Sequence, residues 1–281
     1  MNIVILTGAE LRHTFVRKAM ALAPGISVKR TYCEGTEKSL LRMVETQDSS
    51  NNARLRHLAA REASEHDFFA ALVGLAPDRS NPHFLPKGEI NDPHHANDIA
   101  ALEPDLLAAY GCSLIREPLL SRFEGRFLNV HLGLSPYYRG SGTNFWPLVQ
   151  GRPEFVGATF MYIDAGIDTG AIIHQIRATV LPDDTPHQIG NRLIRDVALV
   201  YAEVIRQFHR LEPMTPLPIP EDEQVCRKKD FDEDSVATLY RNFENGMVAK
   251  YLKNREARCA AVPILENPAV RPVPVLLEDR A

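Results

Sequence analysis

The chain has 281 residues, of which 44% are hydrophobic and 24% charged, and its net charge is −4. This composition excludes a collagen-like, coiled-coil or wholly disordered chain, and no basic excess is present to hold a nucleic-acid backbone by charge alone. No apolar run reaches the roughly 20 residues that a membrane helix needs. The four cysteines are far apart, so we expect reduced thiols in a cytoplasmic protein and no zinc site.

The first 30 residues predict a strand, a helix and a second strand. Asn2–Thr7 is a continuous apolar run, typical of a strand buried on both faces of a parallel sheet. A helical pattern follows from Leu11 and is stopped by Pro24 and Gly25, after which Ile26–Arg30 forms the next strand. Such a unit has a right-handed crossover in nearly every known fold.

The middle of the chain is less regular. We predict a helix over Leu55–Leu75 and a surface loop over Ala76–Asn97, which is rich in Pro, Asn, Asp and His. Leu106–Tyr110 is predicted to be a buried strand, Pro118–Phe123 a short helix and Phe127–Leu132 another strand.

Two β-rich runs and a long helix come next. The runs are Val156–Ile163 and Ala171–Val180, and the helix spans Ile189–Phe208 with its apolar residues on one broad side. The proline content then rises. We therefore predict a main domain over residues 1–212, a semi-rigid proline-rich linker over 213–220 and a small C-terminal extension over 221–281.

Two polar residues interrupt the predicted strand at Phe127–Leu132. Asn129 and His131 are two positions apart, so their side chains point to the same face of the sheet. An internal hydrogen-bond network is one explanation. The other is a ligand site at the carboxyl end of a parallel strand, where open α/β sheets bind their ligands.

The segment Asp164–Gly170 contains two acids and two glycines between the two predicted strands. One interpretation is a turn whose acids face water. The other is a loop that brings one carboxylate to a site on the neighbouring strands. Neither segment alone separates these alternatives.

Together the motifs resemble those of the 10-formyltetrahydrofolate-dependent formyltransferase and hydrolase family. That resemblance rests on three segments in order: Asn129-Val-His131, then Leu134-Ser135-Pro136-Tyr-Tyr-Arg139-Gly140, then Asp164-Ala-Gly-Ile-Asp168-Thr-Gly170. The likeness covers roughly residues 1–210. It implies an α/β fold with a Rossmann-like, mostly parallel sheet, followed here by the small C-terminal extension.

The resemblance also implies roles for individual residues. Asn129, His131 and Asp168 match the family's catalytic trio, whose reaction is attack of an amine on a formyl carbon. Asn129 and a protonated His131 would donate hydrogen bonds to the formyl oxygen, on which negative charge develops. Asp168 would favour the charged imidazole and take the proton of the amine. No metal is implied.

The co-substrate that the resemblance implies is 10-formyltetrahydrofolate. Its pterin is expected in a mostly apolar cleft between the strand at 106–110 and the loop at 164–170. The residues that we predict to line this cleft are Leu106, Tyr110, Gly111, Cys112, Asp164, Gly166 and Ile167.

The formyl acceptor is predicted from residues that depart from the family's patterns. The turn after the first strand, Gly8–His13, lacks the second glycine and the Ser-Asn pair of the ribonucleotide enzymes, although Arg12 is a candidate anion contact. Tyr137, Tyr138 and Arg139 are candidate contacts for an aromatic or phosphate-bearing acceptor. We predict a primary amine on a small molecule, such as a nucleotide-linked amino sugar or an amino-acid-like metabolite.

Three alternatives stay open at this point. One is hydrolysis of 10-formyltetrahydrofolate, for which the same trio is suitable. Another is formylation of methionyl-tRNA or a ribonucleotide, although the extension is short and not strongly basic, which argues against a nucleic-acid partner. The third is a folate-binding module without catalysis. A homodimer also stays open, because symmetric dimers are common.

Overall fold

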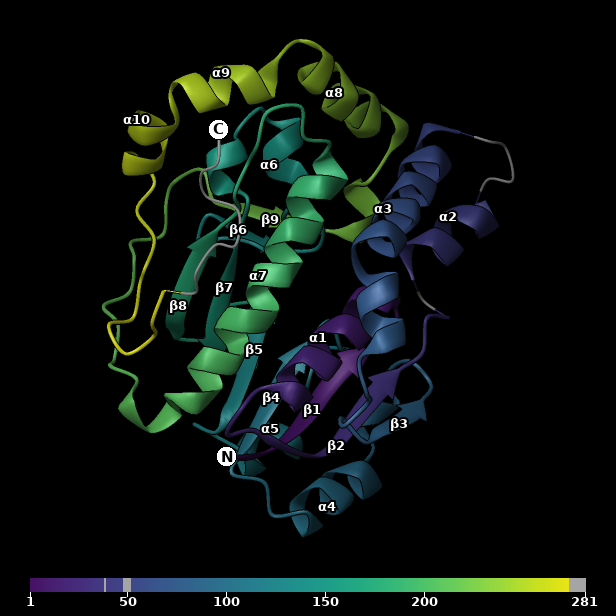
Figure 1. Cartoon of the computed structure of the whole chain (residues 1–281), viewed down its shortest axis with the longest axis vertical. Helices are drawn as coiled ribbons and strands as arrows, with labels where there is room; N and C mark the ends of the chain where they lie inside the picture. The colour runs from purple at the N-terminus through teal and green to yellow at the C-terminus, as the bar shows by residue number, and fades with distance from the viewer. Residues whose placement is uncertain (38, 48–51, 273–281) are drawn as a thin grey trace.

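A computed structural model describes residues 1–37, 39–47 and 52–272, and Figure 1 shows its course. Its main feature is a seven-stranded sheet with the order β3-β2-β1-β4-β5-β7-β8. The strands from β3 to β5 are parallel to one another, and β7 and β8 are antiparallel to their neighbours. Their bounds are β1 Asn2–Gly8, β2 Ser27–Glu34, β3 Pro82–Leu85, β4 Leu106–Tyr110, β5 Phe127–His131, β7 Gly157–Tyr162 and β8 Ile172–Arg177. The α/β, mostly parallel fold expected from the sequence is confirmed.

Helices cover both faces of the sheet. Their bounds are α1 Leu11–Leu22, α2 Leu40–Gln47, α3 Ala53–Leu75, α4 Pro93–Ala101, α5 Leu119–Arg122, α6 Trp146–Val149, α7 Pro186–Arg206, α8 Glu233–Glu244, α9 Met247–Lys253 and α10 Arg255–Ala260. Short 3-10 turns lie at Glu89–Asn91, Pro153–Phe155, Phe208–Arg210 and Lys228–Asp230. Among the described helices, none is both long and apolar enough to span a membrane.

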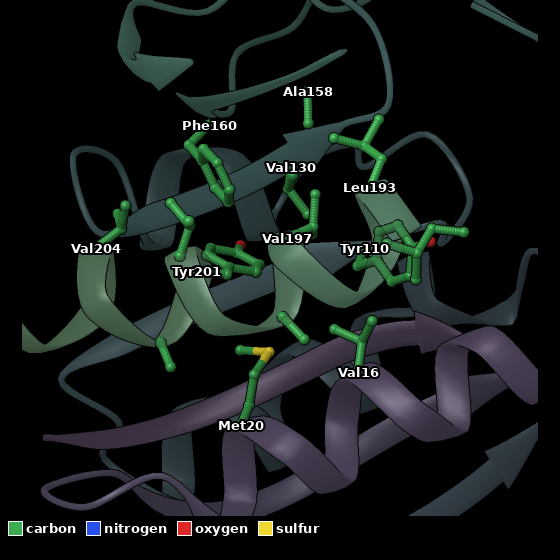
Figure 2. Close-up of a cluster of buried hydrophobic side chains, with 14 of the residues drawn as sticks. Val16, Met20, Tyr110, Val130, Ala158, Phe160, Leu193, Val197, Tyr201 and Val204 are labelled. Atoms are coloured by element: carbon green, nitrogen blue, oxygen red, sulfur yellow. The ribbon is translucent and has the colours of Figure 1, made fainter. Parts of the chain in front are cut away.

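Alternation along the central strands divides the core into two layers. Ile3 and Ile5 of β1 pack with α1 and α7, whereas Val4 and Leu6 pack on the other face with α4 and α5. Figure 2 shows Met20 of α1 facing the side of α7 that carries Tyr201. Apolar side chains thus project from both faces of β1 into the core, which explains why its sequence is a continuous apolar run.

The predicted loop over 76–97 is wrong in part. It contains β3 and the first residues of α4, which starts at Pro93. The strand is a short edge strand paired with β2, and three of its four residues are exposed. No apolar alternation marks such a strand in the sequence, because pairing with β2 rather than burial of its own face holds it in place.

The C-terminal extension packs against the main domain, as Figure 1 shows for α8 beside α6. Its strand β9, Gln224–Cys226, pairs in parallel with β6, Tyr138–Gly140. Its helices α8 and α9 are separate, and Gly246 between them adopts a left-handed conformation with φ 74°. The division into two domains stays a prediction, and residues 273–281 of the extension lie outside the described part.

Candidate active site

Asn129 and His131 lie on β5, the strand where the parallel part of the sheet meets its antiparallel part. Asn129 is paired with Ala109 of β4 on one side and Met161 of β7 on the other. The Tyr201 hydroxyl of α7 lies 3.2 Å from the Ala109 carbonyl and 3.0 Å from the Leu128 carbonyl, within hydrogen-bonding reach of both. This contact ties α7 to β4 and β5, the two strands that carry the site.

The imidazole of His131 lies between two acceptors. Its Nε2 is 3.1 Å from the Tyr138 carbonyl oxygen, and its Nδ1 is 3.3 Å from Oδ2 of Asp168. Asp168 belongs to the loop between β7 and β8 and has a positive φ of 52°. Its Oδ2 also accepts a hydrogen bond of 3.0 Å from the Gly140 amide. The structure therefore brings two of the three predicted catalytic side chains into contact.

Burial sets the proton state of this pair. It lowers the pKa of the His131 imidazole below its ordinary value, and the Asp168 carboxylate opposes that shift only in part. Nε2 faces a carbonyl oxygen and Nδ1 faces a carboxylate oxygen, and both oxygens can accept a hydrogen bond from the imidazole. At rest, desolvation outweighs the nearby carboxylate and favours the neutral imidazole, and the protonated His131 expected in the transition state stays a prediction.

The third member of the trio has no fixed protein partner. Asn129 is half-buried and, within the described residues, its side-chain amide makes no hydrogen bond. It lines a cavity of about 620 Å³ together with His131 and Asp168. An unpaired amide at the wall of a cavity is suited to bind a polar ligand atom.

Six of the seven residues predicted for the folate cleft line this cavity: Tyr110, Gly111, Cys112, Asp164, Gly166 and Ile167. Leu106 does not. It is the first residue of β4, at the far end of the strand from Tyr110, and it is fully buried in the core. The Leu106 prediction is corrected for that reason. Burial raises the pKa of the Cys112 thiol to about 12, which makes it an unreactive wall residue.

Two carboxylates, those of Asp164 and Glu34, accept hydrogen bonds from the loops around the cavity. Asp164 accepts hydrogen bonds from the Gly166 amide at 2.9 Å and from the Thr169 hydroxyl at 2.8 Å, within its own loop. Glu34, which is fully buried, accepts from the Ser113 amide at 2.5 Å and from Lys87 Nζ at 3.0 Å. Each loop is therefore held in one shape before a ligand binds.

Among the predicted acceptor contacts, only Arg12 lines the cavity. Tyr138 is buried in a separate cluster with Phe155, and Tyr137 reaches outward to hydrogen-bond the Pro263 carbonyl at 3.0 Å. Arg139 is held by Glu223 at 2.7 Å. None of these three residues lines the cavity, so their prediction as acceptor contacts is corrected, although Arg139 also donates to the carbonyl of the cavity residue Ile167 at 3.4 Å.

Comparison with known proteins identifies the family. The model of the formyl transferase family matches residues 42–205, more than half of the chain. The chain belongs to the formyl transferase family. Its fold is similar to that of phosphoribosylglycinamide formyltransferase from Anaplasma phagocytophilum, with a TM-score of 0.54 and 15% identity over 81% of this chain and 98% of that one. It is also similar to a sugar N-formyltransferase from a Shewanella species, with a TM-score of 0.53 and 15% identity over 82% and 78% of the two chains.

The sequence relatives are longer proteins. A methionyl-tRNA formyltransferase from Chlorobium chlorochromatii is 28% identical over 171 residues, which are 58% of this chain and 53% of that protein. One from Desulforamulus reducens is 36% identical over 130 residues, 46% and 39% of the two proteins. The matches therefore span about half the length of these relatives, or less.

Several residues that line the cavity were not predicted as site residues from the sequence. The cavity is also lined by His57 and Arg61 of α3, His187 and Asn191 of α7, and Arg227, Lys228 and Phe231 of the extension. They lie on three segments that only the folded chain brings together. The sequence offered one local indication of these residues, the opposite charges of Arg61 and Glu65 one helical turn apart. In the structure, Arg61 Nε lies 3.6 Å from a Glu65 oxygen.

Buried neutral histidines make the protein sensitive to acid. Burial lowers the pKa of His57 to about 3 and that of His174 to about 4. Both are expected to titrate near 6.5 when unfolded, so the unfolded chain binds more protons below that pH. Stability is fully present above about pH 6.5 and falls as the pH drops toward the folded-state pKa values.

We expect each histidine to remove about 1.4 kcal/mol from the free energy of unfolding at about pH 5.5, compared with about pH 7.5. Urea unfolding at the two pH values measures this loss. His57→Gln and His174→Gln are each expected to reduce the pH dependence, because glutamine keeps an acceptor but does not titrate. An equal pH dependence in both variants and the parent would contradict this account.

Proposed function

We propose that this protein transfers a formyl group from 10-formyltetrahydrofolate to a primary amine of a small molecule. The observation that carries the proposal is the meeting of Asn129, His131 and Asp168 at one cavity, with His131 and Asp168 3.3 Å apart. Membership of the formyl transferase family supports the reaction class.

The residues account for each step of such a transfer. The amine nitrogen attacks the formyl carbon, and Asn129 donates a hydrogen bond to the oxygen that becomes negative. His131, supported by Asp168, accepts the proton that the amine loses. The bond between the formyl carbon and the folate nitrogen then breaks, and the same proton passes to that nitrogen. The products are the new amide and tetrahydrofolate, and the proton that the amine lost is now on the folate nitrogen.

The cavity walls are suited to a flat aromatic donor. Leu114 and Ile167 lie on the two loops that flank the cavity, and they are 48% and 55% exposed although both are large and apolar. A ring between these loops would cover the apolar side chains. The backbone of the loops held by Glu34 and Asp164 is available to bind the ring edge.

The charge of the chain supports a small acceptor. The net charge of −4 gives no general attraction for a nucleic acid. We therefore propose a nucleotide-linked amino sugar or an amino-acid-like metabolite as the acceptor. The four unpaired cysteines support a cytoplasmic location.

Transfer of a labelled formyl group tests the proposal. The protein is incubated with 10-formyltetrahydrofolate labelled in the formyl carbon and with nucleotide-linked amino sugars, amino acids, glycinamide ribonucleotide or methionyl-tRNA. Label in the amide of a small molecule supports the proposal. Rapid release of formate without any amine would instead show a hydrolase, and label only in methionyl-tRNA would show that the acceptor is wrong.

A further inference from the structure

One short strand contacts both members of the catalytic pair, His131 and Asp168. In strand β6, Tyr138–Gly140, the Tyr138 carbonyl oxygen lies 3.1 Å from Nε2 of His131. Two residues later, the Gly140 amide donates a hydrogen bond of 3.0 Å to Oδ2 of Asp168. Both contacts are made by backbone atoms. The position of β6 therefore determines where the imidazole and the carboxylate lie relative to each other.

Strand β6 lies outside the seven-stranded sheet of the described structure and pairs there with β9 of the C-terminal extension. The Gln224 amide donates to the Tyr137 carbonyl at 2.9 Å, and the Ser141 amide donates to the Cys226 carbonyl at 2.9 Å. A strand of three residues depends on such pairing for its order. The extension, which follows the residues 42–205 that match the family model, thus holds the strand that contacts the catalytic pair.

Gly140 permits a close approach of the two strands. Its φ is +92°, and a Cβ at this position would clash with the carbonyl oxygen of Cys226. Glycine is suited both to the left-handed conformation and to the lack of space. The amide of the same residue binds Asp168, so a single position contacts both β9 and the catalytic acid.

An ion pair forms a second link between the extension and the loop of Asp168. Nε of Arg139 lies 2.7 Å from an oxygen of Glu223, and each of these side chains is only 21% exposed. The same guanidinium donates at 3.4 Å to the carbonyl of Ile167, the residue before Asp168. A long arginine side chain has many rotamers in water, and the Glu223 carboxylate favours the one that reaches the loop.

The backbone conformation of Asp168 gives this support a purpose. Its φ of 52° is less favourable for aspartate than for glycine, and surrounding contacts keep such a residue in place. Within the described structure, its carboxylate contacts Gly140 and His131, both outside its own loop. The acid therefore depends on β6 for its position, and β6 depends on the extension.

We propose that the C-terminal extension positions the catalytic acid: β9 anchors β6, and Glu223 holds Arg139 against the loop of Asp168. Glu223 does not line the cavity, so it is a positioning residue that acts through Arg139 and Asp168. This inference rests on the proposed function, because its effect on turnover is an effect on Asp168. The order of the loop can be measured without turnover, which keeps the two proposals separable.

Glu223→Ala tests the ion pair, with Asp222→Ala as its matched control. Asp222 is the adjacent acid and also pairs with an arginine of the main domain, Arg152, at 3.0 Å, but neither of these two residues lines the cavity. We expect Glu223→Ala to lower kcat for formyl transfer about tenfold, because a small displacement of a reacting group is costly. The control should lower it by less than about twofold.

A double variant tests the route of this effect. When Glu223→Ala is combined with Asp168→Asn, the glutamate has no carboxylate left to position. We therefore expect Glu223→Ala to lower kcat by less than about twofold in that background. A role of Glu223 in overall stability would instead give the same fall in both backgrounds.

Gln224→Pro tests the pairing of the strands, with Gln224→Ala as its control. Proline removes the amide that donates to the Tyr137 carbonyl, whereas alanine removes the same side chain and keeps that amide. Hydrogen–deuterium exchange over residues 164–170 is measured in all variants without substrate. We expect exchange at least about threefold faster in Glu223→Ala and Gln224→Pro, and the parent's rate in the two controls.

Faster exchange of the loop, together with loss of the Glu223→Ala effect in the Asp168→Asn background, supports the proposal. It is overturned by a fall in kcat that persists in that background, by equal effects of Glu223→Ala and Asp222→Ala, or by unchanged exchange in Glu223→Ala, which keeps the test open should the proline variant not fold. If the parent formylates no acceptor, the proposed function fails, and the exchange measurement alone decides whether the extension holds the loop.

Discussion

Replacing Asp168 by asparagine is expected to lower kcat for formyl transfer by about 10²- to 10⁴-fold. The amide keeps the shape of the carboxylate and its contact with the Gly140 amide, but it carries no charge to stabilise a proton arriving on Nδ1 of His131. The measurement is initial rate against acceptor concentration with the best amine from the labelled-formyl assay.

Asp164→Asn is the matched control, since both acids belong to the loop between β7 and β8. Among the residues that the structure describes, Asp164 hydrogen-bonds only within that loop, to the Gly166 amide and the Thr169 hydroxyl. We expect its replacement to act mainly on the KM for 10-formyltetrahydrofolate. An Asp168→Asn enzyme with the parent's kcat, or an Asp164→Asn enzyme with the larger fall in kcat, would refute the assignment of Asp168 as the carboxylate that stabilises the proton on His131.

Asn129→Ala is expected to lower kcat by about 10²- to 10³-fold, the usual effect of removing one donor to a developing oxyanion. The side chain makes no hydrogen bond to the described protein, so its loss leaves no orphaned partner and little change in stability is expected. The KM values should change much less than kcat, because the hydrogen bond strengthens mainly in the transition state.

Asn97→Ala serves as the control for this variant. Asn97 is an exposed residue of α4 that accepts a hydrogen bond from Arg122 at 2.9 Å and does not line the cavity. Its kcat should equal that of the parent, and thermal unfolding of both variants checks that they are folded. An Asn129→Ala enzyme that loses affinity for the donor but keeps kcat would show a binding role instead of oxyanion stabilisation.

The neutral resting state of His131 has a mechanistic consequence. Nε2 of the imidazole faces the Tyr138 carbonyl and Nδ1 faces Asp168, so a proton that arrives on either nitrogen meets an acceptor. Burial thus prepares a proton acceptor rather than a permanent cation. The oxyanion contact is therefore assigned to Asn129, because its side-chain amide makes no hydrogen bond within the described residues.

Local spacing determined much of this site from the sequence. Asn129 and His131 share a face because successive side chains of a strand alternate, and the apolar runs around them predicted the buried central strands. The glycine-rich segment that carries Asp168 was predicted between two strands for the same local reasons. The alternation rule works because each residue's direction depends only on its own backbone.

Only the tertiary structure decided the remaining features. It packed Tyr137 and Tyr138 against other parts of the chain, placed Leu106 at the far end of β4, and lowered the pKa of His131 through burial. It also brought the extension beside Asp168 through the pairing of β6 with β9. These outcomes depend on contacts between segments far apart in the chain and on the removal of water, neither of which leaves a periodic pattern in the sequence.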